Sequence, residues 1–106
     1  MALHISAWDL PSNAKNLKAY NEKSKGWVKT VLSQPGVKEF RAYRDPLRNS
    51  PTVMIHVEFD SLESIIRYVK SDDYQKITDE MIKLGCSNFS NEMWDGSPLI
   101  PEPLKP

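Results

Sequence analysis

Apolar and polar side chains alternate along residues 53–59. One set points to one side of an extended chain and the other set to the opposite side: Val53, Ile55, Val57 and Phe59 against Met54, His56 and Glu58. A period of two is typical of a strand whose two faces have different surroundings. Asp60 and Ser61 follow directly, and their side chains can end the strand and cap a helix.

Helical spacing begins at residue 62. Apolar positions recur along one stripe as far as residue 84, with a pause at 71–73: Leu62, Ile65, Ile66, Val69, Ile77, Met81 and Leu84. The stripe predicts a helix over 62–84, closed by Gly85 as a left-handed cap. A similar stripe predicts a helix over 14–32, and it consists of Leu17, Tyr20, Trp27, Val28, Val31 and Leu32.

Three further strands are predicted, over 3–9, 37–44 and 86–94. The first alternates between two sets, Leu3, Ile5 and Ala7 against His4, Ser6 and Trp8. The second sets Phe40 and Ala42 against Glu39, Arg41 and Tyr43. The third alternates weakly, with Phe89, Asn91 and Met93 against Asn88, Ser90, Glu92 and Trp94, so the sequence determines its register least.

The order strand, helix, strand, strand, helix, strand predicts an α+β fold of the ferredoxin-like βαββαβ type. Crossover handedness places strands 3–9 and 53–59 at the centre of a four-stranded antiparallel sheet, with two helices on one face. We expect Leu3, Ile5 and Ala7 to face those helices, beside the odd-numbered side chains of 53–59. The opposite face would carry a mixed set: His4, Ser6, Trp8, Arg41, Tyr43, Met54, His56 and Glu58.

Length and charge narrow the class of protein. The 106 residues suffice for one domain, 1–96, followed by a C-terminal arm, 97–106, with four prolines. Fourteen basic residues balance fourteen acidic ones, which argues against nucleic acid or an anionic membrane surface as a partner. No apolar run approaches the ~20 residues of a membrane-spanning helix. The N-terminus has no signal-peptide pattern and Cys86 is the only cysteine, which favours a cytoplasmic protein.

The mixed face of the sheet predicts self-association. It carries charges and histidines but also large aromatic side chains, and an exposed patch of this kind marks an interface. Two such sheets facing each other would cover both patches and enclose a cavity, so we expect a homodimer. The alternative is a monomer with a sparsely aromatic solvent face. We expect the proline-rich arm to be extended and to pack against the partner subunit, against the alternative of a frayed terminus.

Two motifs stand out within this pattern. Gln34-Pro35-Gly36-Val37 enters the strand that ends in Tyr43-Arg44-Asp45, and Phe59-Asp60-Ser61 leads through the next helix to Tyr68 and Ser71-Asp72-Asp73-Tyr74. With these motifs, residues 3–94 resemble the dimeric α+β barrel superfamily, and within it the antibiotic biosynthesis monooxygenase-like group. The resemblance implies the ferredoxin-like fold and a dimer. Activities in that group include cofactor-free oxygenation, haem degradation and isomerisation.

The haem-degrading branch of the group fits this chain poorly. That branch has an asparagine on its first strand, a tryptophan at the end of the third and a histidine on the second helix. This chain has Phe59 at the end of the third strand and no histidine within 62–84, and its first strand presents His4, Ser6 and Trp8. We therefore set haem degradation aside.

The resemblance implies a cofactor-independent monooxygenase that binds a small apolar or aromatic, enolisable molecule in the barrel, with no metal and no cofactor. Such an enzyme needs a proton acceptor, and an imidazole or a carboxylate suits that role, so His56, Glu58 and His4 are the candidate catalytic residues. The candidate substrate-binding residues share the same face or edge: Ser6, Trp8, Arg41, Tyr43, Met54 and Trp94.

Structural roles compete with these assignments. His56 can be a hydrogen-bonded packing residue, and Glu58 can simply pair with Arg41. His4, His56 and Glu58 can be drawn as a metal set, but no HxH or HExxH spacing supports zinc. For the protein as a whole, the alternative functions are a dimer that binds a small molecule without chemistry and a structural dimer whose interior its own side chains fill.

Overall fold

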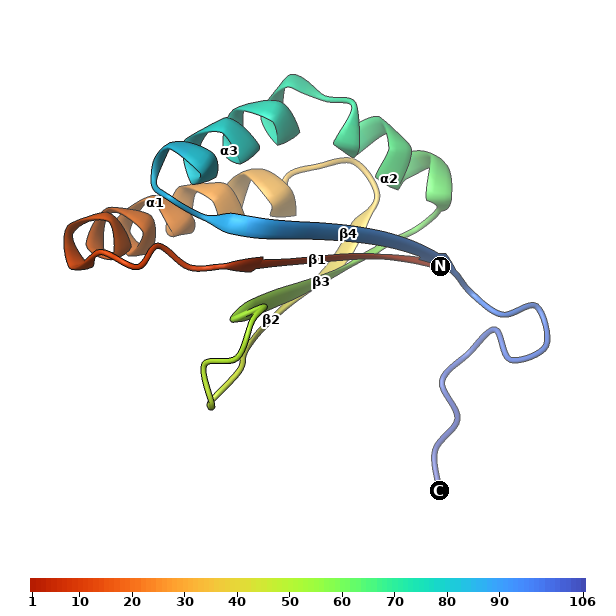
Figure 1. Ribbon diagram of the computed structural model, residues 1–106. Helices are drawn as coiled ribbons and strands as arrows, with labels where there is room; N and C mark the ends of the chain where they lie inside the picture. Colours follow the sequence, from red (N-terminus) through yellow and green to blue (C-terminus); the bar gives the residue numbers. More distant parts are fainter.

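The computed structural model describes residues 1–106 and contains four strands and three helices (Figure 1). In chain order they are β1 (Ala2–Asp9), α1 (Ala14–Leu32), β2 (Val37–Arg44), β3 (Val53–Phe59), α2 (Leu62–Val69), α3 (Asp72–Lys83) and β4 (Ser87–Asp95). The strands form one antiparallel sheet in the order β2-β3-β1-β4. All three helices lie on one face of this sheet, which confirms the predicted ferredoxin-like fold. None of the helices is long and apolar enough to span a membrane.

The predicted helix over 62–84 is two helices. α2 ends at Val69, and α3 begins after Ser71, whose hydroxyl accepts a hydrogen bond from the Tyr74 backbone N–H. The same hydroxyl donates to the Tyr68 carbonyl oxygen at 2.6 Å. Ser71 therefore satisfies backbone groups at the end of one helix and the start of the next, and the pause in the apolar stripe at 71–73 is a helix boundary.

Gly36 lies in the turn between α1 and β2, and it contacts the turn between β3 and α2. It has φ +89°, a conformation that side chains rarely adopt, and its carbonyl oxygen accepts a hydrogen bond from the Asp60 backbone N–H at 2.8 Å. The Asp60 carboxylate in turn accepts a 2.6 Å hydrogen bond from the Ser64 hydroxyl. A Cβ on Gly36 would meet both of these side-chain oxygens at 2.5 Å, so only glycine fits this turn.

The hydrophobic core lies between the sheet and the helices in two clusters. One consists of Ala2, Val31, Val57, Phe59, Ile65 and Tyr68, and the other of Trp8, Tyr20, Val53, Met81 and Cys86. Ile55 packs against both clusters. As predicted, the odd-numbered side chains of β3 face the helices.

The predicted facing of β1 is wrong. His4 pairs with Val57, Ser6 with Ile55 and Trp8 with Val53. Directly paired residues point to the same side of a sheet, so the even-numbered side chains of β1 join the odd-numbered ones of β3 beneath the helices. Trp8 and Ala2 are buried there, whereas Leu3 and Ile5 lie half-buried on the other face. Both faces of β1 carry apolar side chains, so its pattern alone does not determine which face meets the core.

The C-terminal residues 97–106 contain no helix or strand and extend away from the domain (Figure 1). The Gly96 backbone N–H donates to the Met1 carbonyl oxygen at 3.0 Å, and the chain leaves the sheet after this bond. Leu99 and Leu104 are 90% and 79% exposed. Within this one chain, therefore, the apolar side chains of the arm are uncovered.

Candidate functional site

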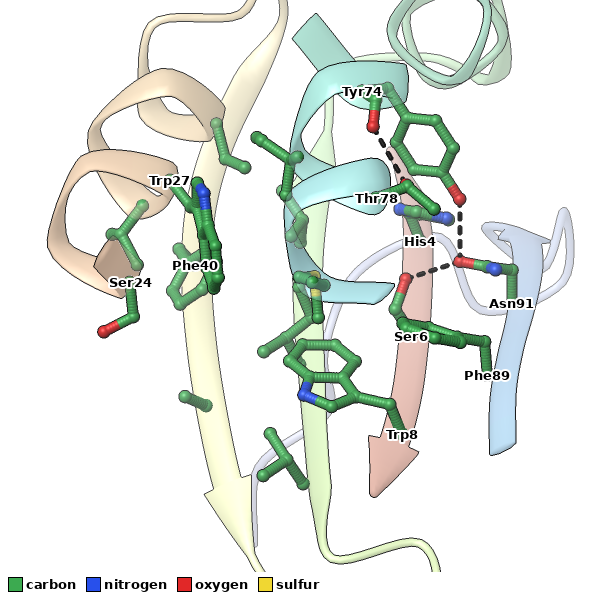
Figure 2. Close-up of a pocket in the computed structure, with 18 of the residues that line it drawn as sticks. His4, Ser6, Trp8, Ser24, Trp27, Phe40, Tyr74, Thr78, Phe89 and Asn91 are labelled. Atoms are coloured by element: carbon green, nitrogen blue, oxygen red, sulfur yellow. Dashed lines mark hydrogen bonds between the residues drawn. The ribbon is translucent and has the colours of Figure 1, made fainter. Parts of the chain in front are cut away.

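A cavity of about 310 Å³ lies between the sheet and the helices, at the small end of the range for ligand pockets (Figure 2). All four strands contribute to its wall, for example through His4, Phe40, Ile55 and Asn91. α1 contributes Tyr20 and Trp27, α2 contributes Tyr68, and α3 contributes Tyr74 and Thr78. Most of the lining is apolar or aromatic, and four of its polar side chains lie together on one side, away from Ser24 and Arg44.

This polar end of the cavity consists of His4, Ser6, Tyr74 and Asn91. The Ser6 hydroxyl donates a 2.6 Å hydrogen bond to Asn91 Oδ1, and the Tyr74 hydroxyl donates to the same oxygen at 3.3 Å. Figure 2 shows both bonds converging on Asn91 from β1 and α3. The three side chains thus link the first strand, the last helix and the edge strand beside His4.

His4 is the most deeply buried polar side chain of the site. Only 2% of its surface is exposed, and neither ring nitrogen has a hydrogen-bond partner. Burial lowers the pKa of His4 below its ordinary value of 6.5, and a polar interaction with the nearby Asn91 side chain opposes part of that shift. His4 is therefore neutral near pH 7. A buried polar group without a protein partner costs about 1–3 kcal/mol, and a catalytic role is one of the explanations for such groups in folded proteins.

Two tyrosines enclose the His4 ring. The Tyr68 ring lies edge-on to it with the centroids 6.1 Å apart, and the Tyr74 ring is tilted at 6.3 Å. The two tyrosine rings also contact each other edge to face at 5.2 Å. Burial raises the pKa of both phenols, so each stays protonated at neutral pH and can donate a hydrogen bond but cannot act as a base.

The other side of the cavity is aromatic. Trp27 and Phe40 lie there, across the cavity from Ser6 and Asn91 (Figure 2). The Trp27 indole N–H donates a 2.8 Å hydrogen bond to the Glu80 carboxylate, which fixes the ring between α1 and α3. Trp8 donates to the Tyr20 hydroxyl at 3.1 Å, and the Tyr20 ring packs edge-on against Trp27. This network holds flat apolar surfaces in fixed positions, as a ring-shaped ligand requires.

The structure divides the sequence-predicted site residues between the two faces of the sheet. His4, Ser6 and Trp8 line the cavity beneath the helices. Arg41, Met54, His56, Glu58 and Trp94 belong to the opposite, open face by their register in β2, β3 and β4. Tyr43 borders the cavity, but its ring packs against His56, with the centroids 5.0 Å apart. The candidate bases His4 and His56 are therefore not brought together.

The open face differs from expectation in one further detail. Arg41 donates to the carboxylate of Glu39 on its own strand, and not to Glu58, whose pairing with Arg41 was the structural alternative to a catalytic role. His56 pairs with Ile5 and Arg41 in the register of the sheet, and its Nε2 atom is buried without a partner. The structure contains no group of three or more His, Cys, Asp or Glu side chains placed to hold a metal ion.

Sequence reasoning missed several cavity residues, among them Tyr20, Trp27, Tyr68, Tyr74 and Asn91. The helical tyrosines and the tryptophan lie on apolar stripes, where packing residues and cavity-lining residues look alike. Asn91 had a usable signal: it lies between Phe89 and Met93 on the more apolar side of β4. A lone amide on such a face indicates a polar partner across the core.

Solved structures match this fold over nearly its whole length. A candidate antibiotic biosynthesis monooxygenase from Deinococcus radiodurans matches with a TM-score of 0.80 and 10% identity, over 99% of this chain and 97% of that one. SnoaB, a cofactor-independent oxygenase from Streptomyces nogalater, matches with a TM-score of 0.68 and 9% identity, over 95% and 97%. The fold is that of the antibiotic biosynthesis monooxygenase-like proteins.

A third match concerns assembly. A dimeric protein of unknown function with a ferredoxin-like fold, from Bacteroides fragilis, has a TM-score of 0.70 at 9% identity, over 89% of this chain and 94% of that one. No protein-family model and no curated protein matches the chain. At these identities the likeness establishes the fold, and any activity has to be argued from the residues of this chain.

Proposed function

We propose that the protein is a cofactor-independent monooxygenase whose active site is the cavity between the helices and the sheet. The observation that carries the proposal is His4, a buried and neutral imidazole without a partner, at the polar end of a cavity walled by aromatic rings. A general base needs a free lone pair at the working pH, and burial keeps that of His4 available. The likeness in fold to a cofactor-independent oxygenase supports the same class of reaction.

The ligand would be a flat, enolisable aromatic compound. Its rings would lie against Trp27 and Phe40, and its head group would reach His4 and Asn91. A cavity of about 310 Å³ favours a compact ring system over a large cofactor-sized molecule. Aromatic walls exclude water around the reacting carbon, and this protects a reactive anion from protonation by solvent.

The reaction balances without an added reductant. His4 takes a proton from a methylene group activated by a neighbouring carbonyl or phenol, and the resulting anion gives electrons to O₂. A C–O bond forms to give a peroxide anion, which takes the proton back from the His4 imidazolium, and the resulting hydroperoxide then loses water. One CH₂ group and one O₂ thereby become one C=O group and one H₂O, with the second methylene proton leaving in the water. Tyr68 stays protonated, so it can donate a hydrogen bond to the oxygen on which the negative charge develops.

The burial of His4 limits which substrates can react. Because its pKa is lowered, proton transfer to His4 is uphill unless the substrate is acidic or the new anion stays close to the imidazolium. An anion that stays close to the imidazolium forms an ion pair with it, and inside an apolar cavity this attraction is strong enough to favour the proton transfer. The proposal thus favours carbon acids and phenols of low pKa over simple ketones.

The protein would act as a homodimer formed through the open face of the sheet. Leu3, Ile5 and Met54 lie half-buried on that face, and Tyr43 and Trp94 are exposed there, so a second sheet would remove apolar surface from water. The dimeric ferredoxin-like protein among the matches supports the formation of a dimer. The C-terminal arm, residues 97–106, would cover part of the partner subunit with Leu99, Ile100 and Leu104.

The test is oxygen uptake by the purified protein with a panel of phenols and enolisable aromatic ketones, together with product analysis. The proposal expects one O₂ consumed for each CH₂ converted into C=O, in the presence of a metal chelator. Binding of these compounds without oxygen uptake would identify the alternative, a binding module without chemistry. Neither uptake nor binding anywhere in the panel would favour a purely structural dimer.

A further inference from the structure

The two nitrogens of His4 are covered as well as unpartnered. Both are buried from solvent although the side chain borders the cavity. The Tyr74 ring lies beside His4, and its hydroxyl ends on Asn91 Oδ1. A ligand in the cavity of this chain therefore cannot reach His4 until a neighbouring group moves.

Of the groups around His4, Tyr74 is the one held most weakly. Its hydroxyl bond to Asn91 is 3.3 Å long, beyond the usual range for O–H···O bonds, and lies at the exposed edge strand. Tyr68, in contrast, belongs to the buried core cluster around Phe59 and Ile65. Ser6 is on the central strand β1, and its bond to the same oxygen is 2.6 Å.

We propose that Tyr74 occupies the head-group position of the site in the free protein and that the ligand displaces its hydroxyl. Tyr74 presents a phenol to the aromatic edge of His4 and an O–H to Asn91, so the side chain imitates the ligand that would replace it. The proposal rests on the proposed function only in using the same cavity. Its new content is that Tyr74 competes with the ligand and that Asn91 sets the chemistry of the head group.

The acceptor on Asn91 determines which head groups fit. Because Oδ1 accepts the bond that Tyr74 gives up, the incoming group has to donate a hydrogen bond, as an uncharged hydroxyl does. A carboxylate or phosphate would face this oxygen with no donor of its own. An anion there would also be repelled by the partial negative charge of this oxygen, unless a cation lay beside it.

No cation lines the polar end of the cavity. Arg44 is the only charged side chain in the lining. It pairs with Val53 of β3, whereas His4 pairs with Val57 of the same strand. Four residues along a strand separate the two positions by about 13 Å, and the strand β3 lies between β2 and β1. The site should therefore accept an uncharged hydroxyaryl compound and reject the corresponding aryl carboxylate.

The experiment compares three probes, 2-naphthol, naphthalene and 2-naphthoate, bound without oxygen so that no turnover occurs. Quenching of Trp8 and Trp27 reports binding, in a Trp94→Phe background that removes the tryptophan of the open face. We expect Tyr74→Phe, which keeps the ring but removes the competing hydroxyl, to bind 2-naphthol about two- to tenfold more tightly, the weight of one neutral hydrogen bond. Asn91→Leu should abolish the preference for 2-naphthol over naphthalene.

The His4 ring provides an independent readout. In the NMR spectrum, the His4 ring protons should shift when 2-naphthol binds, while those of His56 on the open face serve as the internal reference. Unchanged or weaker binding of 2-naphthol by Tyr74→Phe would overturn the proposal, and so would equal affinity of the original protein for 2-naphthoate and 2-naphthol. The expected binding pattern without any oxygen uptake would leave this inference standing and reject the proposed monooxygenase activity alone.

Discussion

His4 and His56 lie on opposite faces of the sheet, although the strands that carry them are neighbours. His4 pairs with Val57 and His56 pairs with Ile5, so the two imidazoles are one position apart along the ladder and point in opposite directions. One histidine is beneath the helices, beside the cavity, and the other is on the open face. The two candidate bases therefore belong to different surfaces, and substitutions can test them separately.

Glycine substitutions test the turn at Gly36, which connects α1 to β2 and bonds to Asp60. We expect Gly36→Ala to lower the free energy of unfolding by about 2–4 kcal/mol, because the new Cβ would collide with the Asp60 and Ser64 oxygens at a positive φ. Gly26→Ala is the matched control: a Cβ meets nothing within 4 Å there, and alanine favours the helix by about 0.5–1 kcal/mol. Urea unfolding of both variants measures the difference. Equal effects would refute the account of Gly36.

The pH dependence of stability tests the burial of neutral His4. Since burial lowers its pKa below the ordinary value of 6.5, the unfolded chain binds a proton that the folded protein does not. Stability should therefore decrease as the pH falls below about 6.5 and continue to do so towards the lowered pKa. His4→Gln should flatten this decrease between pH 7 and 5, measured by urea unfolding, while His56→Gln should retain it. The same slope in His4→Gln as in the original protein would contradict a buried, neutral His4.

Truncation after Gly96 tests the C-terminal arm. Leu99 and Leu104 are almost fully exposed in the single chain, and covering them against a partner would contribute about 25 cal/mol per Å². We expect the dimer dissociation constant of the truncated protein to be at least about tenfold higher than that of the original protein. Sedimentation over a dilution series measures both constants. Leu99→Ser with Leu104→Ser in the full-length chain is the control that keeps the backbone of the arm. An unchanged constant in both cases would mean that the arm is a free terminus.

The elements of the fold were predictable because local patterns encode them. Val53 to Phe59 alternates strictly, and Ser61 caps α2 as expected, with its side chain accepting from the Ser64 backbone N–H. The break between α2 and α3 is visible in the sequence as the pause at 71–73, although the apolar stripe on either side predicts one continuous helix. Ser71 carries the signal, because a serine followed by two aspartates is a typical helix start.

The position of the site was not predictable, because it depends on which side chains of β1 face the helices. The register of β1 against β3 decides this, and a slip of one residue reverses every side chain. His4 and Ser6 are polar, so their pattern favours the open face, yet they border the cavity beneath the helices, where Ser6 bonds to Asn91. The local rule that buries Leu3 and Ile5 fails here, as sequence rules do at functional sites, and this agrees with the proposed position of the active site.

The most direct test of the account compares oxygen uptake by His4→Phe and His56→Phe, using whichever phenol the original protein oxidises fastest and a chelator throughout. Removal of a general base typically costs about a hundredfold or more, so His4→Phe should lose nearly all turnover. His56→Phe should retain turnover within about twofold, because His56 lies on the other face of the sheet. Loss of turnover in His56→Phe with full activity in His4→Phe would place the chemistry on the open face and contradict the account.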